Sequence, residues 1–349
     1  MKVPLIAFFD AKDYEIEFFE KDAQRTGVSF KYYKNRLNPD TVAMAKGYDG
    51  VCAFVNDDLS SPVINKLADY GVSLIALRCA GFNNVDLNSA YKRVHVVRVP
   101  SYSPYAVAEH ALALIFTLNR HTHKAYYRTR DNNFNINGLL GFDLKGKTIG
   151  VVGTGTIGKT FIKLLSGFNM EILAYDIYPD TEFSKDHNVK YIQLDELFKR
   201  SDIISLHCPL TPDNVYMINS ESIGSMKKGV MLINTGRGKL INTKDLIEGI
   251  KKERIGYAGL DVYEEETEYF FEDFSNSVIS DDMLSRLLTF PNVLITSHQG
   301  FFTREALRNI SSTTCENIKF FFSDNEVPNE ICYRCENEEC LKKNNQRCF

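Results

Sequence analysis

The chain has 349 residues, of which 44% are hydrophobic and 25% charged, and its formal net charge is −4. This length and composition favour a folded protein with two domains over a disordered chain. The slightly acidic balance, without a broad basic stripe, argues against a nucleic-acid-binding surface. No apolar run approaches the roughly 18 residues that a membrane span needs, and the start, MKVPLIAFFD, matches a core strand better than an export signal.

Residues 1–100 alternate short apolar runs with amphipathic segments. The apolar runs predict strands at 5–9, 29–33, 51–55, 74–77 and 96–99. The segments between them predict helices near 13–26, 40–46, 62–70 and 86–92. This alternation predicts a parallel sheet with helices on both faces.

The chain is expected to leave this first domain near residue 102. Pro100 and Pro104 bracket a break in the pattern, and 109–118 then predicts a strongly apolar helix. His121 and His123 form an H-x-H pair at a helix end. A metal site needs more ligands than the sequence offers there, so a solvated helix end is the favoured interpretation.

Residues 148–176, TIGVVGTGTIGKTFIKLLSGFNMEILAYD, combine a strand, a glycine-rich turn, a helix and a second strand. Gly153, Gly155 and Gly158 fit G-x-G-x-x-G, which allows a tight turn, close approach of a pyrophosphate and close helix packing. The helix N-terminus offers unpaired N–H groups to phosphates. Asp176, about twenty residues on, can hold both adenosine ribose hydroxyls and would repel a 2′-phosphate. The stretch therefore predicts an NAD site rather than an NADP site.

The strand-like runs that follow end at Ile192, His207, Asn234, Val262 and Thr296. Several chemically distinctive residues stand at or just beyond these ends: Cys208, Pro209, Thr235, Gly236, Arg237, Asp261 and His298. In an open parallel sheet, ligands bind outside the carboxyl ends of the strands. We therefore expect these residues and the glycine-rich turn to share one edge of a second sheet.

The segment after His298, FFTREALRNISSTTCENIKFFF, predicts a long amphipathic helix with too much apolar surface to stand alone. We expect it to cross back to the first domain. The predicted organisation is a discontinuous domain of residues 1–102 and 299–349 around a second domain of residues 103–298, with a cleft between them.

Three kinds of side chain are candidates for chemistry at the predicted edge. Arg237 lies between two glycines after a strand, and its guanidinium can grip a carboxylate with two parallel hydrogen bonds. His298 is a candidate acid/base, although a lone histidine is more often structural. A carboxylate could orient the imidazole, but spacing does not choose among the acids of one loop, which can equally be solvated: Glu264, Glu265, Glu266 and Glu268.

Seven stretches between about residues 74 and 330 carry a family resemblance: LRCAGFNNVDL, VRVPSYSPYAVAEHALALIFTLNR, GKTIGVVGTGTIGK, DIISLHCPLTPDN, GVMLINTGRGKLINT, GLDVYEEETEYFFED and NVLITSHQGFFTREAL. The sequence resembles the D-isomer-specific 2-hydroxyacid dehydrogenases, and within them most of all the fermentative D-lactate dehydrogenases. The resemblance implies an α/β fold of two doubly wound parallel-sheet domains, a Rossmann cofactor domain inserted into a flavodoxin-like substrate domain. It also implies NADH-dependent reduction of pyruvate to D-lactate by a homodimer or larger homo-oligomer. A cytoplasmic location is expected separately, because there is no export signal and Cys52, Cys79, Cys208 and Cys315 are predicted to be reduced core residues.

The resemblance assigns roles to individual residues. The catalytic set would be Arg237, Glu266 and His298, in which Glu266 keeps the imidazole protonated for reduction. The implied cofactor contacts are Thr156 and Ile157 at the pyrophosphate, Asp176 at the ribose, Cys208, Pro209 and Asn214 at the adenosine side, and Thr235, Gly236 and Asp261 at the nicotinamide. The implied substrate contacts are the N–H groups near Ala80 and Gly81, Tyr102 beside them, and Phe301 and Phe302 around the substrate side chain.

Two other functions remain open at this point. One is a broader D-2-hydroxyacid dehydrogenase for larger 2-keto acids, and the other is an NADH-sensing binding protein of the corepressor type on the same fold. An acidic insertion at 263–285 resembles the lactate-specific branch.

The C-terminal tail carries four further cysteines: Cys332, Cys335, Cys340 and Cys348. Their spacing matches no familiar zinc module, so an inert tail is favoured over a redox or metal site and no metal is expected.

Overall fold

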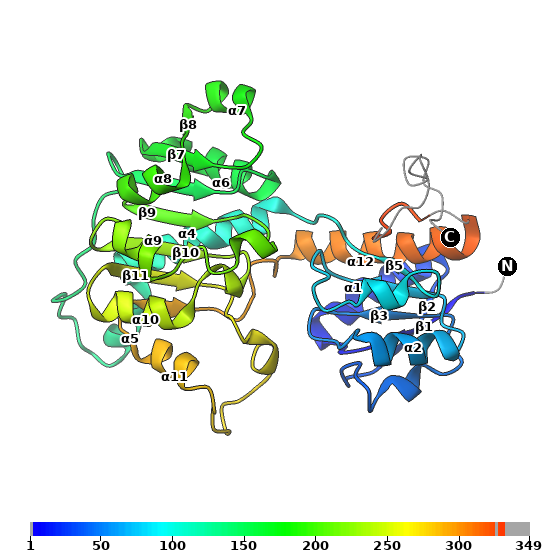
Figure 1. Cartoon of the computed structure of the whole chain (residues 1–349). Helices are drawn as coiled ribbons and strands as arrows, with labels where there is room; N and C mark the ends of the chain where they lie inside the picture. Colours follow the sequence, from blue (N-terminus) through cyan, green and yellow to red (C-terminus); the bar gives the residue numbers. More distant parts are fainter. Residues whose placement is uncertain (1–2, 325–326, 332–349) are drawn as a thin grey trace. The chain divides into compact units, whose positions relative to one another are not determined.

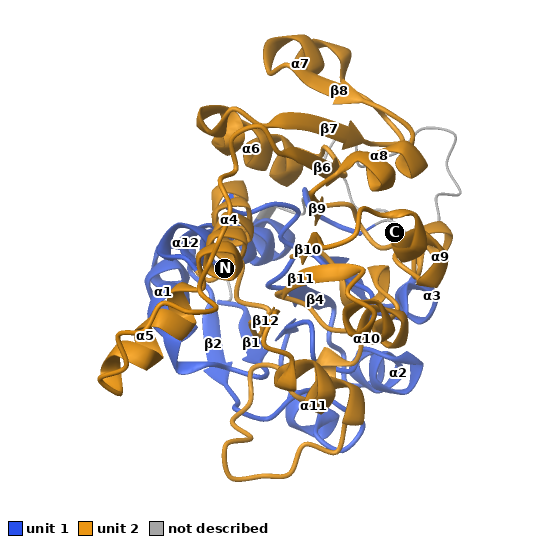
Figure 2. Ribbon diagram, turned by 90° about the vertical axis from the view of Figure 1, so that its left-hand side faces the viewer, with its two compact units in different colours: residues 1–103, 303–349 blue, residues 104–302 orange. Residues whose placement is uncertain are grey.

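The computed structural model describes residues 3–324 and 327–331, so the predictions for the cysteines of the C-terminal tail lie outside the described residues. The chain forms two compact units, a smaller one up to Ser103 and again from Thr303, and a larger one spanning Pro104–Phe302 (Figure 2). Residues 299–302 belong to the larger unit, where the Asp261 carboxylate accepts hydrogen bonds from the N–H groups of Gln299 and Gly300.

The smaller unit contains a parallel sheet in the order β2-β1-β3-β4-β5, which is the flavodoxin-like order. Its strands are β1 Leu5–Phe8, β2 Ser29–Tyr32, β3 Gly50–Ala53, β4 Leu74–Leu77 and β5 His95–Val97. Its helices are α1 Asp13–Thr26, α2 Ser61–Asp69, α3 Leu87–Ala90 and α12 Arg304–Lys319. Because α12 packs against α1 and β4, the chain returns to the first sheet after forming the larger unit.

Two of the helices predicted in this unit are shorter than expected. Residues 40–46 form only a 3-10 turn, Val42–Ala45, which ends before Gly47 with its φ of +88°. Residues 86–92 form a single turn, because Asp86 caps the N–H groups of Asn88 and Ser89 and Tyr91 leaves the helical conformation. Segments this short contribute too few apolar side chains to extend a helix against the sheet.

The larger unit contains a seven-stranded parallel sheet in the order β12-β11-β10-β9-β6-β7-β8. Its strands are β6 Thr148–Val152, β7 Glu171–Tyr175, β8 Val189–Tyr191, β9 Ile203–Leu206, β10 Val230–Asn234, β11 Ile255–Leu260 and β12 Val293–Ile295. Its helices are α4 Pro104–Arg120, α5 Thr122–Arg130, α6 Thr156–Leu165, α7 Thr181–Asp186, α8 Leu194–Arg200, α9 Ser220–Ser225, α10 Thr243–Lys251 and α11 Asp282–Thr289 (Figure 1).

Helices cover both faces of this sheet. Ile149 and Val151 of β6 pack into a core cluster with residues of α4 and α6, whereas Val152 joins a second cluster with residues of α8, α9 and α10. Alternate residues of a strand point to opposite faces, which explains why the whole of β6 is apolar and buried. The predicted α/β class with two doubly wound parallel sheets is confirmed.

The order of the sheet reverses at β6, which lies between β7 and β9. Such a switch point leaves a crevice outside the carboxyl end of the central strand, where dinucleotides bind in this type of sheet. Helix α5 was not predicted, because it buries none of its residues and therefore has no apolar periodicity.

Candidate active site

The glycine-rich turn follows β6 at this switch point. Gly153 has a φ of +93°, and a Cβ atom there would lie 2.5 Å from the backbone nitrogen of Cys208. A Cβ at Gly158 would lie 2.0 Å from the carbonyl oxygen of Gly153, so both positions require glycine. A Cβ at Gly155 would meet nothing within 4 Å. Gly155 thus faces open space in front of α6, whose first N–H groups, those of Thr156 and Ile157, are in the position that suits an anion.

Asp176 follows β7 and is tied to the glycine-rich turn. Its Oδ2 accepts hydrogen bonds from the N–H (2.6 Å) and hydroxyl (3.1 Å) of Thr154, and its Oδ1 accepts one from the N–H of Tyr178 (2.9 Å). Tyr191 donates its hydroxyl to Thr154. The carboxylate is therefore held beside the turn with lone pairs left for ribose hydroxyls.

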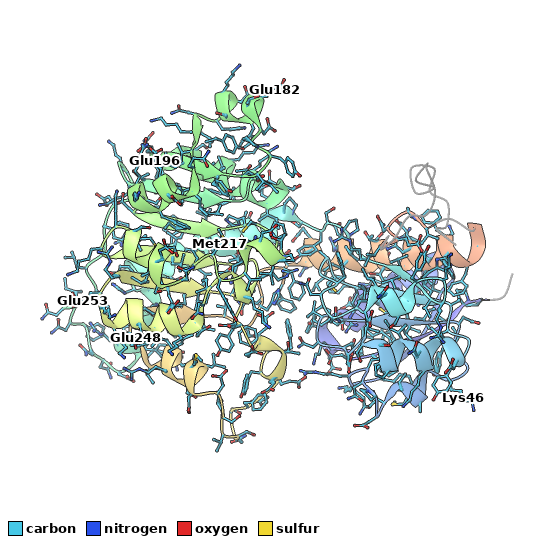
Figure 3. The ribbon with its side chains drawn as sticks, in the orientation of Figure 1. Lys46, Glu182, Glu196, Met217, Glu248 and Glu253 are labelled. Atoms are coloured by element: carbon cyan, nitrogen blue, oxygen red, sulfur yellow. The ribbon has the colours of Figure 1, made fainter. Side chains whose placement is uncertain are left out.

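The segment after β9 forms the other side of the crevice. Cys208 contacts Gly153 as described, and Asn214 donates its amide to the carbonyl oxygen of Pro209 (2.8 Å). The Cys208 sulfur lies 3.9 Å from that of Met217, which Figure 3 labels. Burial raises the pKa of the Cys208 thiol to about 11, so this sulfur is a neutral packing group at neutral pH.

The predicted acid/base pair is in direct contact in the larger unit. Nδ1 of His298 lies 2.8 Å from Oε1 of Glu266, and Oε2 of Glu266 accepts a hydrogen bond from the N–H of Tyr263 (2.9 Å). Both side chains are 19% exposed. Because the carboxylate holds Nδ1, the Nε2 atom of His298 is left to exchange a proton with a ligand.

The structure gives the acids of this loop different partners, although their spacing in the sequence did not distinguish them. Glu264 is bound to the N–H and hydroxyl of Thr243 (3.1 and 2.7 Å) and to the hydroxyl of Tyr216, so it fastens the loop. Glu265 is largely exposed and lies 4.0 Å from Lys239. Glu266 alone among them contacts the imidazole within the described residues.

Arg237 lies on a loop that touches the loop of Glu266. A Cβ at Gly238 would lie 2.1 Å from the carbonyl oxygen of Tyr263, so the two backbones are in contact. The Arg237 guanidinium donates to the carbonyl oxygen of Gly236 (2.8 Å) and forms no ion pair with any described residue. Most of its donors are therefore available for an anion.

Asp261 has a role that the sequence did not indicate. Its buried carboxylate accepts hydrogen bonds from the hydroxyl of Thr296 (2.5 Å) and from the N–H groups of Gln299 (2.9 Å) and Gly300 (2.8 Å). Its backbone carbonyl accepts the N–H of His298 (2.7 Å), which has a φ of +51°. Asp261 thus holds the loop of His298 in a conformation that non-glycine residues rarely adopt.

His110 of α4 was missed as a site residue. Its Nε2 lies 3.0 Å from the hydroxyl of Thr296 and 3.2 Å from Asp261, so it supports the same loop. Only its position within AVAEHA, one of the resembling stretches, could have drawn attention to it.

Two residues predicted to flank the nicotinamide differ in whether their hydrogen-bonding groups are available to a ligand. The N–H of Gly236 is already donated to the side chain of Asn234 (3.0 Å). The hydroxyl of Thr235 is buried and has no hydrogen-bond partner among the described residues. A buried polar atom without a partner is costly, so the hydroxyl fits a group that binds a polar ligand such as a carboxamide.

One phenylalanine, Phe271, contacts the ring of His298, and a second one packs on Phe271. The ring centroid of Phe271 lies 6.1 Å from that of His298 and 6.4 Å from that of Phe301, which is buried, whereas Phe302 is exposed. In the smaller unit, Ala80 and Gly81 follow β4, and Tyr102 lies at the end of that unit's first segment.

The H-x-H pair is not the solvated helix end that was expected, because His121 is buried. His121 packs its ring against Tyr257, and burial lowers the pKa of both His121 and His123. Within residues 3–324 and 327–331, no group of three or more His, Cys, Asp and Glu side chains could hold a metal ion. Nor does any helix there have the length and apolarity to span a membrane.

Known proteins are similar to this chain along most of its length. Residues 112–300 match the model of the D-isomer specific 2-hydroxyacid dehydrogenase NAD-binding domain. The chain is 47% identical over 327 residues to a D-lactate dehydrogenase of Escherichia coli, covering 93% of this chain and 99% of that protein. The chain belongs to the D-isomer-specific 2-hydroxyacid dehydrogenases. It is therefore an oxidoreductase that uses NAD and acts on 2-hydroxy and 2-keto acids, which confirms the predicted family and cofactor.

Solved structures give the same result. A pyruvate reductase of Chlamydomonas reinhardtii has a TM-score of 0.88 and 43% identity, covering 94% of this chain and 98% of that one. A D-2-hydroxyisocaproate dehydrogenase has a TM-score of 0.81 and 31% identity, covering 94% and 99%.

Proposed function

We propose that this dehydrogenase reduces pyruvate to D-lactate with NADH. The observation that carries the proposal is the His298–Glu266 pair, whose side chains are 2.8 Å apart, with Glu266 on a loop in backbone contact with the loop of Arg237. The choice of pyruvate is supported by the relatives, since the names of the Escherichia coli and Chlamydomonas reinhardtii proteins specify D-lactate and pyruvate.

Each residue has a defined part in the proposed reaction. Arg237 binds the substrate carboxylate through two parallel hydrogen bonds. The family resemblance implies that the N–H groups of Ala80 and Gly81 are also carboxylate donors. The glycine-rich turn and Asp176 hold NADH, which supplies the hydride for the keto carbon. His298 donates the proton from Nε2 to the keto oxygen, and Glu266 stabilises the imidazolium before transfer. In the reverse direction, neutral His298 accepts the hydroxyl proton.

The decisive test is an NADH-oxidation assay with pyruvate, followed by chiral analysis of the product. We expect stoichiometric D-lactate. L-lactate, or no turnover in a protein that binds NADH, would refute the proposal.

A second candidate is a preference for larger 2-keto acids. Phe271 and Phe301 place an apolar wall beside His298, and one similar structure is named as a D-2-hydroxyisocaproate dehydrogenase. Comparison of kcat/KM for pyruvate, phenylpyruvate and 2-ketoisocaproate separates the candidates, because one or two methylenes change the rate by about 10–200-fold.

We also propose that the protein works as a cytosolic homo-oligomer. Several apolar side chains of α5 and the segment after it are strongly exposed: Tyr126, Tyr127, Phe134, Ile136 and Leu140. Contiguous exposed apolar surface is typical of a protein–protein interface, and a second copy is the occupant that the family resemblance implies. Light scattering of the wild type and of Leu140→Ser tests this, and a wild-type monomer would refute it.

A further inference from the structure

The loop after β4 presents two backbone N–H groups that lack acceptors. Neither the N–H of Ala80 nor that of Gly81 is donated to any residue in the described part of the chain. Both residues are only partly buried. Two adjacent amides of this kind can bind an anion such as a carboxylate.

Arg98, which follows β5, binds this loop through the carbonyl oxygen of Ala80. Its Nη1 donates to the carbonyl oxygen of Ala80 (2.7 Å), and its guanidinium carbon lies 5.1 Å from the ring centroid of Phe82. The length of the first contact is typical of a charge-assisted hydrogen bond.

The backbone of Arg98 is itself fixed by the returning C-terminal segment. Its N–H donates to the carbonyl oxygen of Asn329 (3.1 Å), and its carbonyl oxygen accepts the side-chain amide of Asn317 (2.9 Å). The side-chain amide of Asn329 donates in turn to Oδ1 of Asn317 (2.7 Å), which closes the network. The backbone of Arg98, from which the guanidinium reaches Ala80, is therefore held in place on both sides of its Cα atom.

The geometry of the peptide bond links this contact to the free amides. The carbonyl of Ala80 and the N–H of Gly81 belong to one planar trans peptide, so they point in opposite directions. A cation on the carbonyl oxygen fixes the direction of the Gly81 N–H and polarises it. Arg98 has no acidic partner among the described residues, so its charge also remains uncompensated there.

We propose that Arg98 is a positioning residue for the substrate carboxylate, acting through the Ala80–Gly81 peptide. The inference rests on the proposed function and deepens it, because it assigns a cation behind the amides that receive the anionic end of a 2-keto acid. Arg98 does not touch the reacting atoms, so its contribution is to carboxylate affinity rather than to the proton or hydride step.

The test compares Arg98→Lys, Arg98→Gln and Arg98→Met with wild type. We expect Arg98→Met to raise both the KM for pyruvate and the Ki of oxamate, a carboxylate analogue of pyruvate, by about tenfold. The affinity for NADH should stay unchanged and kcat should change less than KM. Arg98→Lys, which keeps the charge, should recover most of the oxamate affinity, and Arg98→Gln should lie between the two.

Arg93→Gln is the matched control. Arg93 precedes β5 as Arg98 follows it, but it binds Asp69 and Asn65 at the surface, so this variant should keep wild-type constants. Unchanged oxamate affinity in a folded Arg98→Met protein would overturn the inference. The inference would also be overturned if, in all three variants, oxamate affinity fell in proportion to the fall in melting temperature. That pattern would indicate only structural damage.

The outcome is separable from that of the proposed function. Oxamate binding to the NADH complex is measured by calorimetry, without turnover. If wild type binds oxamate but does not reduce pyruvate, the proposed function fails, whereas the comparison with Arg98→Met still decides the role of Arg98.

Discussion

The two units hold the charged groups at the carboxyl edges of their sheets in opposite ways. Arg78 follows β4 in the smaller unit, and it is fully buried with two of its nitrogens on Glu15 (3.0 and 3.1 Å). Its guanidinium carbon lies 4.4 Å and 4.8 Å from the ring centroids of Phe8 and Phe54. Arg237 follows β10 in the larger unit, and it has no ion-pair partner within the described residues.

The comparison shows that position after a strand does not by itself mark a reactive group. The charge of Arg78 is balanced inside the protein by Glu15, and only its Nη1 lacks a hydrogen-bond partner among the described residues, so we expect Arg78 to support the fold. Arg237 and the partly exposed His298–Glu266 pair keep donors that a ligand must satisfy. The difference lies in solvent access and internal partners, and each prediction below changes one of these.

The largest expected effect is on catalysis in the larger unit. His298→Gln removes the group that exchanges the substrate proton, and it should lower kcat by roughly 10²–10⁴-fold, the usual scale for one acid/base. Steady-state kinetics with pyruvate and NADH measure this. His187→Gln is the matched control, because the His187 ring packs on Phe183 and makes no side-chain hydrogen bond to another described residue. Wild-type turnover in the His298 variant would remove the assignment.

The next effect is on the stability of the smaller unit. Glu15→Gln leaves the Arg78 guanidinium buried without its counter-charge, which typically costs about 3–5 kcal/mol. Chemical denaturation should show this loss, while kcat of the remaining folded protein stays near wild type. Glu17→Gln on the same helix removes an exposed acid bound to Lys21 and should leave stability unchanged. Equal stability of both variants would contradict the structural role of Arg78.

The same contrast explains what the sequence could and could not predict. Alternating apolar runs and the glycine-rich turn predicted both sheets. A strand that is buried on both faces, such as β6, must be apolar along its whole length, and this is visible in the sequence. Arg78 and Arg237 both follow apolar strands, and only the folded position of Glu15 separates them. Likewise, Glu264 and Glu266 are interchangeable by spacing, whereas the fold gives one to Thr243 and the other to His298.

A third prediction concerns the pH dependence of stability. Burial raises the pKa of Asp57 to about 6, although its carboxylate accepts the N–H groups of Leu37 and Phe54 (both 2.6 Å). The folded state therefore binds this proton more tightly than the unfolded state. The contribution is present below about pH 4 and is lost as the pH rises through 6, a change of about 3 kcal/mol.

Asp57→Asn should abolish that part of the slope. Denaturation at pH 4 and pH 7 gives the free energy of unfolding of wild type and variant. In the difference between the two proteins, the contributions of the other titrating groups cancel. Because an amide has one acceptor oxygen, the variant should also be less stable at pH 4, by about 1–3 kcal/mol. Parallel pH profiles for the two proteins would show that Asp57 does not titrate in this range.

A smaller effect is expected from Arg237→Lys, which keeps the charge but removes the planar fork. The KM for pyruvate should rise by about tenfold, because a lysine cannot make the two parallel hydrogen bonds. Titration of initial rates with pyruvate measures it. An unchanged KM would mean that Arg237 does not bind the substrate carboxylate. The lack of an internal ion pair would then not distinguish a ligand-binding arginine from a structural one such as Arg78.

The smallest effect is expected at Cys208, which lies at the cofactor edge yet resembles the buried groups of the smaller unit. Because burial raises the pKa of its thiol to about 11, only about 0.1% is thiolate at pH 8. Cys208→Ser should therefore leave kcat unchanged, and iodoacetamide should label the wild-type residue slowly with or without NADH. Rapid labelling that NADH prevents would show that the crevice beside Gly153 opens further than this structure indicates, so that local exposure decides reactivity at this edge.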